Sequence, residues 1–142
     1  MSNDPAFRTP LSDSNSRVPP HNVDAEASLL GAMLLSRDAI GPAVETLDGD
    51  QFYVPAHGYI FDAIASLYGA GEPADPVTVA EELTRSGLLE QIGGPQRLLE
   101  LQTATPASSN AARYAQIVEE HALLRRLIGV AGDIVELCYS RP

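Results

Sequence analysis

The sequence predicts an all-α protein, a compact bundle of about six short helices followed by one long C-terminal helix. Apolar residues recur at helical spacing in one segment after another from about residue 20, and no segment has the convincing apolar–polar alternation of a half-buried strand. Prolines and glycines stand where these segments begin and end. The 142 residues, 44% hydrophobic and 20% charged, suffice for one domain with its own core.

The division of the chain follows its composition. Residues 1–18 are predicted to be a flexible arm, because proline, serine, asparagine and aspartate dominate and no apolar period appears. Residues 19–109 are predicted to form the helical bundle, and residues 110–142 the long helix.

The first helix is expected over residues 23–35. Asn22 is its candidate N-cap, and Asp24 and Glu26 stand in the first turn, where acids interact favourably with the helix dipole. We expect its inner face to carry four apolar residues: Val23, Ala27, Leu30 and Leu34.

Two further helices should follow. The one near residues 39–47 tolerates Gly41 and Pro42 because they fall in its first turn. The next begins at Pro55, a favoured first-turn residue, and ends near Gly69. Its apolar face comprises Ile60, Ile64, Leu67 and Tyr68.

The fourth helix should begin with Asp75 as cap and Pro76 at the first position, and Gly87 should end it in the left-handed conformation. Leu83 and Leu88 then stand at positions that usually touch across such an ending. A short turn over residues 88–92 leads to a sixth helix over about 96–103.

The long helix carries the most informative pattern. It should start after Asn110, a candidate N-cap, and its 28 positions from 111 to 138 span about 42 Å. A compact chain of this size has a radius of gyration of only about 14 Å, so the helix should project from the bundle. Residues spaced alternately by three and four form a heptad seam that needs a partner: Tyr114, Ile117, His121, Leu124, Ile128, Ala131, Val135 and Cys138.

Two glycines interrupt this helix. Gly129 and Gly132 each cost about 1 kcal/mol relative to alanine in a helix interior. Either they allow another helix to approach closely, or the long helix breaks there. We expect continuity, because the heptad register runs through both.

Charge and cysteine content narrow the function classes. Nineteen acids stand against nine bases, all arginine, and the formal charge of −10 disfavours direct binding to nucleic acid. Cys138 is the single cysteine, so no internal disulfide can form, and we expect a cytoplasmic protein. No apolar stretch approaches the roughly 20 residues of a membrane span.

We predict no catalytic, cofactor-binding or metal site in this chain. His21, His57 and His121 lack the spacing of a metal site on one helix face, and His121 is expected to be a packed residue that tunes the seam register. A phosphate-binding Walker A loop requires a lysine, and the chain has none. The pairs Glu119–Glu120 and Arg125–Arg126 are interpreted as a salt-bridged exposed face.

Several motifs, in order and at matching spacing, resemble the amino-terminal domain of DnaB-type replicative helicases. The resemblance extends from about residue 18 to the end of the chain. The segments that carry it are residues 18–31 (VPPHNVDAEASLLG), 88–94 (LLEQIGG), Thr105–Pro106, 114–120 (YAQIVEE) and 123–128 (LLRRLI).

This resemblance implies a collar domain that pairs with its neighbours, forms a trimer of dimers on a hexameric ring and docks primase; a helicase loader is a further possible partner. It implies that the long helix is the first arm of an antiparallel hairpin with its tip at residues 139–142. The second arm, the linker and the RecA-like domain that would use ATP and Mg²⁺ would lie outside this chain. The primase-facing positions it implies are Asp24, Arg97, Ile128 and Ile134, although Arg97 departs from the aromatic residue of some relatives, and hairpin packing explains Ile128 and Ile134 equally well.

Two alternatives remain open on the sequence alone. A free-standing helical adaptor or dimerisation protein would show the same amphipathic patterns. A small helical enzyme is motivated only by scattered acids and three histidines, from which no set of nucleophile, base and orienting group can be assembled.

Overall fold

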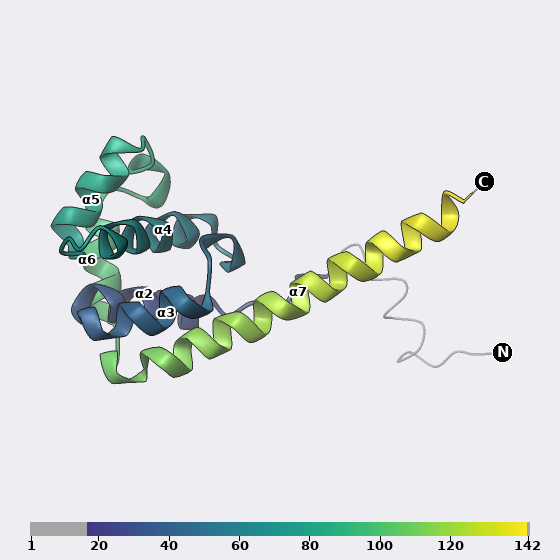
Figure 1. The fold of residues 1–142 in the computed structure, drawn as a ribbon, viewed down its shortest axis with the longest axis horizontal. Coiled ribbons are helices and arrows are strands. Elements are labelled where there is room, and N and C mark those ends of the chain that lie inside the picture. The colour runs from purple at the N-terminus through teal and green to yellow at the C-terminus, as the bar shows by residue number, and fades with distance from the viewer. Residues whose placement is uncertain (1–16, 142) are drawn as a thin grey trace.

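The computed structural model describes residues 17–141, and the regular secondary structure in this part of the chain is entirely helical. Figure 1 shows a compact bundle from which one long helix projects, so the predicted fold class is confirmed. The arm predicted for residues 1–18 lies outside the described residues except for Arg17 and Val18. The α-helices of the described part are α2 (Val23–Leu35), α3 (Ile40–Thr46), α4 (Pro55–Gly69), α5 (Pro76–Arg85), α6 (Pro95–Ala104) and α7 (Ala111–Tyr139).

Helix α2 lies at the centre of the bundle, in contact with α4, α6 and α7. Asn22 caps it as predicted, because its side-chain oxygen accepts a hydrogen bond from the backbone N–H of Ala25 at 2.9 Å. The predicted one-sided apolar face is wrong in part, since Val23 is 39% exposed. With neighbours on several sides, α2 instead buries a broad surface: Ala25, Glu26, Leu29, Leu30, Gly31, Ala32, Met33 and Leu34.

Helix α4 packs beside α2, and α3 packs against α4 and α7. The short α3 follows a 3₁₀ turn, η1 (Arg37–Ala39), and holds Gly41 and Pro42 in its first turn as expected. Helix α4 begins at Pro55 and buries Ile60, Ile64 and Leu67 on the predicted face. A second 3₁₀ turn, η2 (Gly49–Gln51), joins the two helices.

Helix α5 has the ends that the sequence predicts. Asp75 and Thr78 exchange side-chain to backbone hydrogen bonds of 2.9 Å at its start. At its end, Gly87 has a φ of 74° and the N–H of Leu88 donates to the carbonyl of Leu83 at 2.8 Å. The 3₁₀ turn η3 (Glu90–Ile92) falls within the short turn predicted over residues 88–92, and it leads into α6.

Helix α7 is one continuous helix of 29 residues. It passes through Gly129 and Gly132 without a break, as predicted, and its far half extends beyond the bundle in Figure 1. Asn110 is the N-cap residue of α7, as predicted, but it also ends the 3₁₀ turn η4 (Ser108–Asn110) and its side chain makes no capping hydrogen bond.

The contact between α2 and the end of α6 depends on Gly31. A Cβ atom added at this position would collide with the Thr105 side chain and with the backbone carbonyl oxygen of Leu101. The absence of a side chain therefore allows the two segments to approach closely.

We predict that Gly31→Ala lowers the free energy of unfolding by about 1–3 kcal/mol, because the backbone of Leu101 cannot move aside as a flexible side chain would. Urea denaturation followed by circular dichroism measures the loss. Gly69→Ala is the matched control, since nothing lies within 4 Å of the Cβ position there, and it should change stability by less than about 1 kcal/mol. Equal stability of the two variants would show that the contact is not tight.

Candidate helix-pairing interface

The two halves of α7 have different surroundings. The first half packs on the bundle through Ala111, Ala115, Val118 and Ala122, which are all buried. No residue of α7 after Ala122 is buried, and every described residue from Arg126 onward is exposed. The helix is therefore part of the core at its beginning and unsupported at its end.

The unsupported half is nonetheless rich in apolar side chains. Nine large ones are between 46% and 86% exposed: Leu123, Leu124, Leu127, Ile128, Val130, Ile134, Val135, Leu137 and Tyr139. A run of this kind on one short stretch of helix is far more than the scattered apolar residues of an ordinary surface. We call these nine residues the apolar strip.

The strip is too wide for a single partner helix. At about 100° per residue, its members and the intervening Ala131 and Cys138 cover an arc of roughly 200° around the helix axis. The remaining arc carries Arg125, Arg126, Asp133 and Glu136 together with the two glycines. A two-stranded coiled coil uses a narrow a/d seam, whereas this surface suits a helix covered from two sides.

The predicted seam is divided between the two halves of α7. Tyr114 and Ile117 are half-buried and pack against the core of the bundle. His121 is also half-buried, and its Nδ1 lies 2.8 Å from the carbonyl oxygen of Ile117. The remaining predicted members are exposed: Leu124, Ile128, Ala131, Val135 and Cys138.

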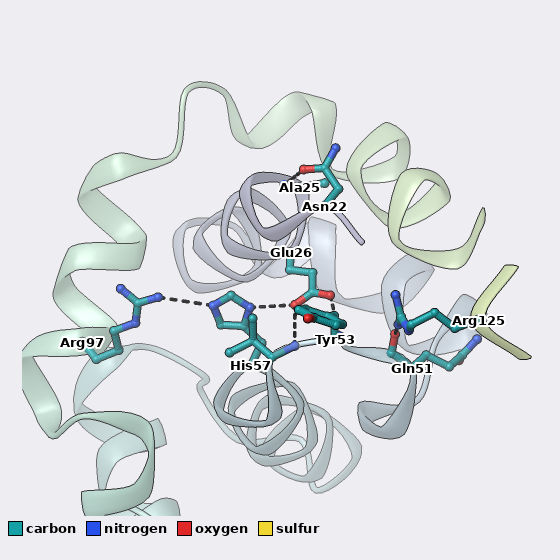
Figure 2. Close-up of polar contacts among 9 residues, drawn as sticks. Asn22, Ala25, Glu26, Gln51, Tyr53, His57, Arg97 and Arg125 are labelled. Atoms are coloured by element: carbon teal, nitrogen blue, oxygen red, sulfur yellow. Dashed lines mark hydrogen bonds and ion pairs between the residues drawn. The ribbon is translucent and has the colours of Figure 1, made fainter. Parts of the chain in front are cut away.

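Arg125 lies where the two halves of α7 meet. Its Nη1 donates to the carbonyl oxygen of Pro20 at 2.7 Å, and its Nη2 donates to that of Gln51 at 2.6 Å. The guanidinium carbon also stands 5.6 Å from the centre of the Tyr53 ring. Figure 2 shows the side chain of Arg125 directed at Gln51, with Tyr53 beside them.

The predicted salt-bridged face of Glu119, Glu120, Arg125 and Arg126 is therefore wrong for Arg125. Among the described residues, no ion pair joins either arginine to either glutamate. Sequence spacing suggested neighbouring exposed charges, but the fold brings two backbone carbonyls from distant segments within reach of Arg125.

A second polar cluster lies inside the bundle and connects α2 with α4. Glu26 is 2% exposed, and its carboxylate accepts hydrogen bonds from the backbone N–H groups of Tyr53, at 2.6 Å, and Val54, at 3.3 Å. His57, which is fully buried, contacts the same carboxylate through Nδ1 at 2.8 Å. These contacts, visible in Figure 2, satisfy a buried charge that would otherwise be costly.

The proton on His57 can be placed from its neighbours. Arg97 Nη2 lies 3.3 Å from His57 Nε2, and a guanidinium has only donors. Nε2 is therefore the acceptor, and the hydrogen is carried by Nδ1, which donates to Glu26. The ring lies between a carboxylate and a guanidinium, and it links α2, α4 and α6 in one chain of hydrogen bonds.

Sequence reasoning missed the buried hydrogen-bonding role of Glu26 and the long-range contacts of Arg125. Glu26 was assigned to the helix dipole because a glutamate in a first helical turn is normally solvated, and nothing local marks it as buried. Arg125 donates to partners 105 and 74 residues earlier in the chain, a separation that no periodicity reports.

The positions that the family resemblance assigns to primase do not form one patch in this chain. Asp24 is exposed in the first turn of α2, and Arg97 on α6 is directed toward His57 and Glu100. Ile128 and Ile134 are exposed on the projecting half of α7, which extends away from α6 in Figure 1. A partner touching all four would have to reach from the bundle to the projecting helix.

Three acids gather where η2 meets α4. Desolvation raises the pKa of the Asp62 carboxyl, a hydrogen bond from the backbone of Gly49 opposes the rise, and the charges of Asp48 and Asp50 add to it.

Among residues 17–141, no group of three or more His, Cys, Asp or Glu side chains is arranged to hold a metal ion. No helix in the same part of the chain is long and apolar enough to cross a membrane.

The described part of the chain is a small helical bundle with a long helix whose far half is left uncovered. A model of the family described as DnaB-like helicase N terminal domain matches residues 18–120. The chain belongs to this family, and the match ends near the point where α7 leaves the bundle.

Curated relatives agree with this assignment. The chain is 50% identical over 131 residues to the replicative DNA helicase DnaB of Mycobacterium leprae, which covers 92% of this chain and 22% of that protein. It is 46% identical over 125 residues to the replicative DNA helicase DnaB of Geobacillus stearothermophilus, covering 88% of this chain and 28% of that protein. The chain thus spans about a fifth to just over a quarter of the length of these relatives.

Solved structures share the fold. The N-terminal domain of DnaB helicase from Mycobacterium tuberculosis matches with a TM-score of 0.84 at 51% identity, covering 87% of this chain and 90% of that one. The N-terminal domain of DnaB helicase from Helicobacter pylori, described together with its interactions with primase, matches with a TM-score of 0.70 at 23% identity, covering 81% of this chain and 89% of that one.

We predict that Glu26→Ala lowers the free energy of unfolding by about 3–5 kcal/mol, because it leaves the donors of Tyr53, Val54 and His57 buried without their acceptor. Urea denaturation measures the loss. Asp24→Ala is the matched control: this acid is in the same helical turn but exposed, so its removal should cost less than about 1 kcal/mol. Similar losses in both variants would mean that the buried cluster contributes no more than the helix dipole does.

Proposed function

We propose that this chain is the collar domain of a hexameric replicative DNA helicase, in which it pairs subunits and docks primase. The observation that carries this proposal is the apolar strip on the projecting half of α7, which the bundle does not cover. Surfaces of this kind on an otherwise ordinary domain mark sites where another protein segment binds. Family membership, with replicative helicases as the named relatives, supports the choice of parent protein.

Two helices can occupy the strip in the assembled protein. Its arc of roughly 200° has room for the returning arm of a hairpin on one side and a neighbouring subunit on the other. Gly132 borders this arc, whereas Gly129 lies in the middle of the polar arc, and the space around both Cβ positions is empty to 4 Å. Gly132 would let a neighbouring helix approach the backbone of α7 closely.

ATP hydrolysis would take place in another domain of the parent protein. This chain has no lysine for a Walker A loop, so ATP and Mg²⁺ would bind in another domain, where hydrolysis drives strand separation. With a net charge of −10, the collar would contribute little direct DNA binding. The bacterial cytoplasm, which holds the chromosome, is the compartment that we propose. A helicase loader remains a further candidate partner.

We expect Leu127→Asp to weaken self-association. Leu127 lies near the middle of the strip, and a carboxylate buried between paired helices should cost roughly 2 kcal/mol or more, about a 30-fold weaker association. Sedimentation velocity over a range of concentrations measures the effect, in the chain extended by the hairpin's second arm as well as in the chain itself.

Leu99→Asp is the control for this experiment. Leu99 and Leu127 are both 55% exposed leucines on helices, but Leu99 is on α6, remote from the projecting half of α7. The two substitutions therefore change charge and hydrophobicity equally. Equal sedimentation of the two variants, or a purely monomeric extended chain at high concentration, would contradict the pairing role.

Primase docking calls for a separate titration. We expect the purified carboxy-terminal domain of primase to bind the self-associated chain saturably, and Asp24→Ala or Ile134→Ala to weaken binding, because both side chains are exposed. Isothermal titration calorimetry measures the affinity, and circular dichroism verifies that each variant is folded. If the folded, associated protein binds no primase, the docking role is lost while the pairing role stands.

A further inference from the structure

The direction in which α7 leaves the bundle requires a physical cause. The part of α7 that packs on the bundle buries Ala111, Ala115, Val118 and Ala122, and the half-buried Tyr114 and Ile117 also pack against the core. Beyond Ile117 only Val118 and Ala122 are buried, so the packed surface is small where the helix leaves the bundle. This contact can hold the helix against the bundle without strongly fixing its tilt.

Arg125 stands one turn beyond Ala122 and is the last half-buried residue of α7. Its planar guanidinium donates to two carbonyls that belong to different segments, those of Pro20 and Gln51. A guanidinium has its donors in a rigid fork, so two bonds restrict its orientation as well as its position. One side chain of α7 is thus joined to two points on the rest of the protein.

Both acceptors are held in place. Gln51 belongs to η2, where its side-chain oxygen accepts from the backbone N–H of Asp48 at 2.7 Å. The segment containing Pro20 is held through His21, whose ring stacks on that of Tyr53 with 4.1 Å between centroids and 11° between planes.

Tyr53 joins this assembly to the core. The Tyr53 ring stacks on His21 and also contacts the guanidinium of Arg125. Its backbone N–H donates to the buried carboxylate of Glu26 at 2.6 Å. The position of Arg125 is therefore set by contacts that lead back to Glu26 in the first turn of α2.

We propose that Arg125 is a positioning residue that fixes the direction of the projecting half of α7 relative to the bundle. The helix continues for 14 residues after Arg125, about 21 Å, so a small change of tilt at this point displaces the end of the strip by several ångströms. The two hydrogen bonds of Arg125 thus hold the bundle and the apolar strip in one relative orientation. The inference goes beyond the proposed function and does not require it, because it concerns the geometry of a single chain.

The natural cysteine makes this orientation measurable. Cys138 is the single cysteine of the chain and is exposed near the end of α7, and Glu81→Cys adds a second exposed labelling site on α5. Double electron–electron resonance between spin labels at the two sites reports the distance from bundle to helix end. An excess of unlabelled Cys138→Ser chain dilutes the labelled molecules, so that distances between associated molecules do not contribute to the signal. A loss of pairing is therefore distinguished from a change in the direction of α7.

Arg126→Ala is the matched control. It removes the same charge from the adjacent position, whose side chain is exposed and makes no hydrogen bond or ion pair with any described residue. We expect a single narrow distance distribution for the unsubstituted chain and for Arg126→Ala, and a broadened or shifted one for Arg125→Ala. Identical distributions in all three would overturn the proposal, since the packing of the first half of α7 on the bundle would then set the tilt by itself.

Arg125→Lys distinguishes the effect of the planar guanidinium geometry from that of the positive charge. Lysine keeps the cation and the aliphatic stem but is a point charge without the rigid planar fork, so we expect a distribution broader than that of the unsubstituted chain. This variant also serves if circular dichroism shows that Arg125→Ala does not fold. A distribution for Arg125→Lys as narrow as that of Arg126→Ala would refute the role of the two-carbonyl geometry.

Discussion

The architecture depends on the burial of one carboxylate. Glu26, in the central helix α2, accepts hydrogen bonds from the segment that opens α4 and from His57, and His57 in turn accepts from Arg97 of α6. A buried charge is stable only when its partners are in place, so these elements must assemble together. Through Tyr53 the same carboxylate supports the site where Arg125 anchors α7.

A second constraint is the mismatch between the 29 residues of α7 and the size of the bundle. The bundle covers the helix only as far as Ala122, and the remaining turns present leucine, isoleucine and valine to solvent. Exposed apolar surface of this kind is unfavourable in an isolated domain and favourable once a partner covers it. The same feature would make the lone chain prone to association, and in the proposed assembly it would provide the surface through which subunits pair.

Most of the fold could be predicted because its signals are local. Proline at the first position of α4 and α5, Asn22 and Asp75 as caps, and a glycine of positive φ after α5 each act within one helical turn. The errors arose where distant segments meet. Val23 was assigned to the core and Met33 was not, because a one-sided stripe cannot describe a helix with neighbours all around it.

The sequence by itself determined the all-helical class, the helix boundaries, the length of α7 and the apolar pattern of its projecting half. These follow from propensity and periodicity, which are read along the chain. Only the tertiary structure decided that Glu26 is buried with His57, that Arg125 bonds to Pro20 and Gln51, and where the seam stops being core and becomes a free surface. Such contacts join residues tens of positions apart, and their partners are defined only once the helices have packed.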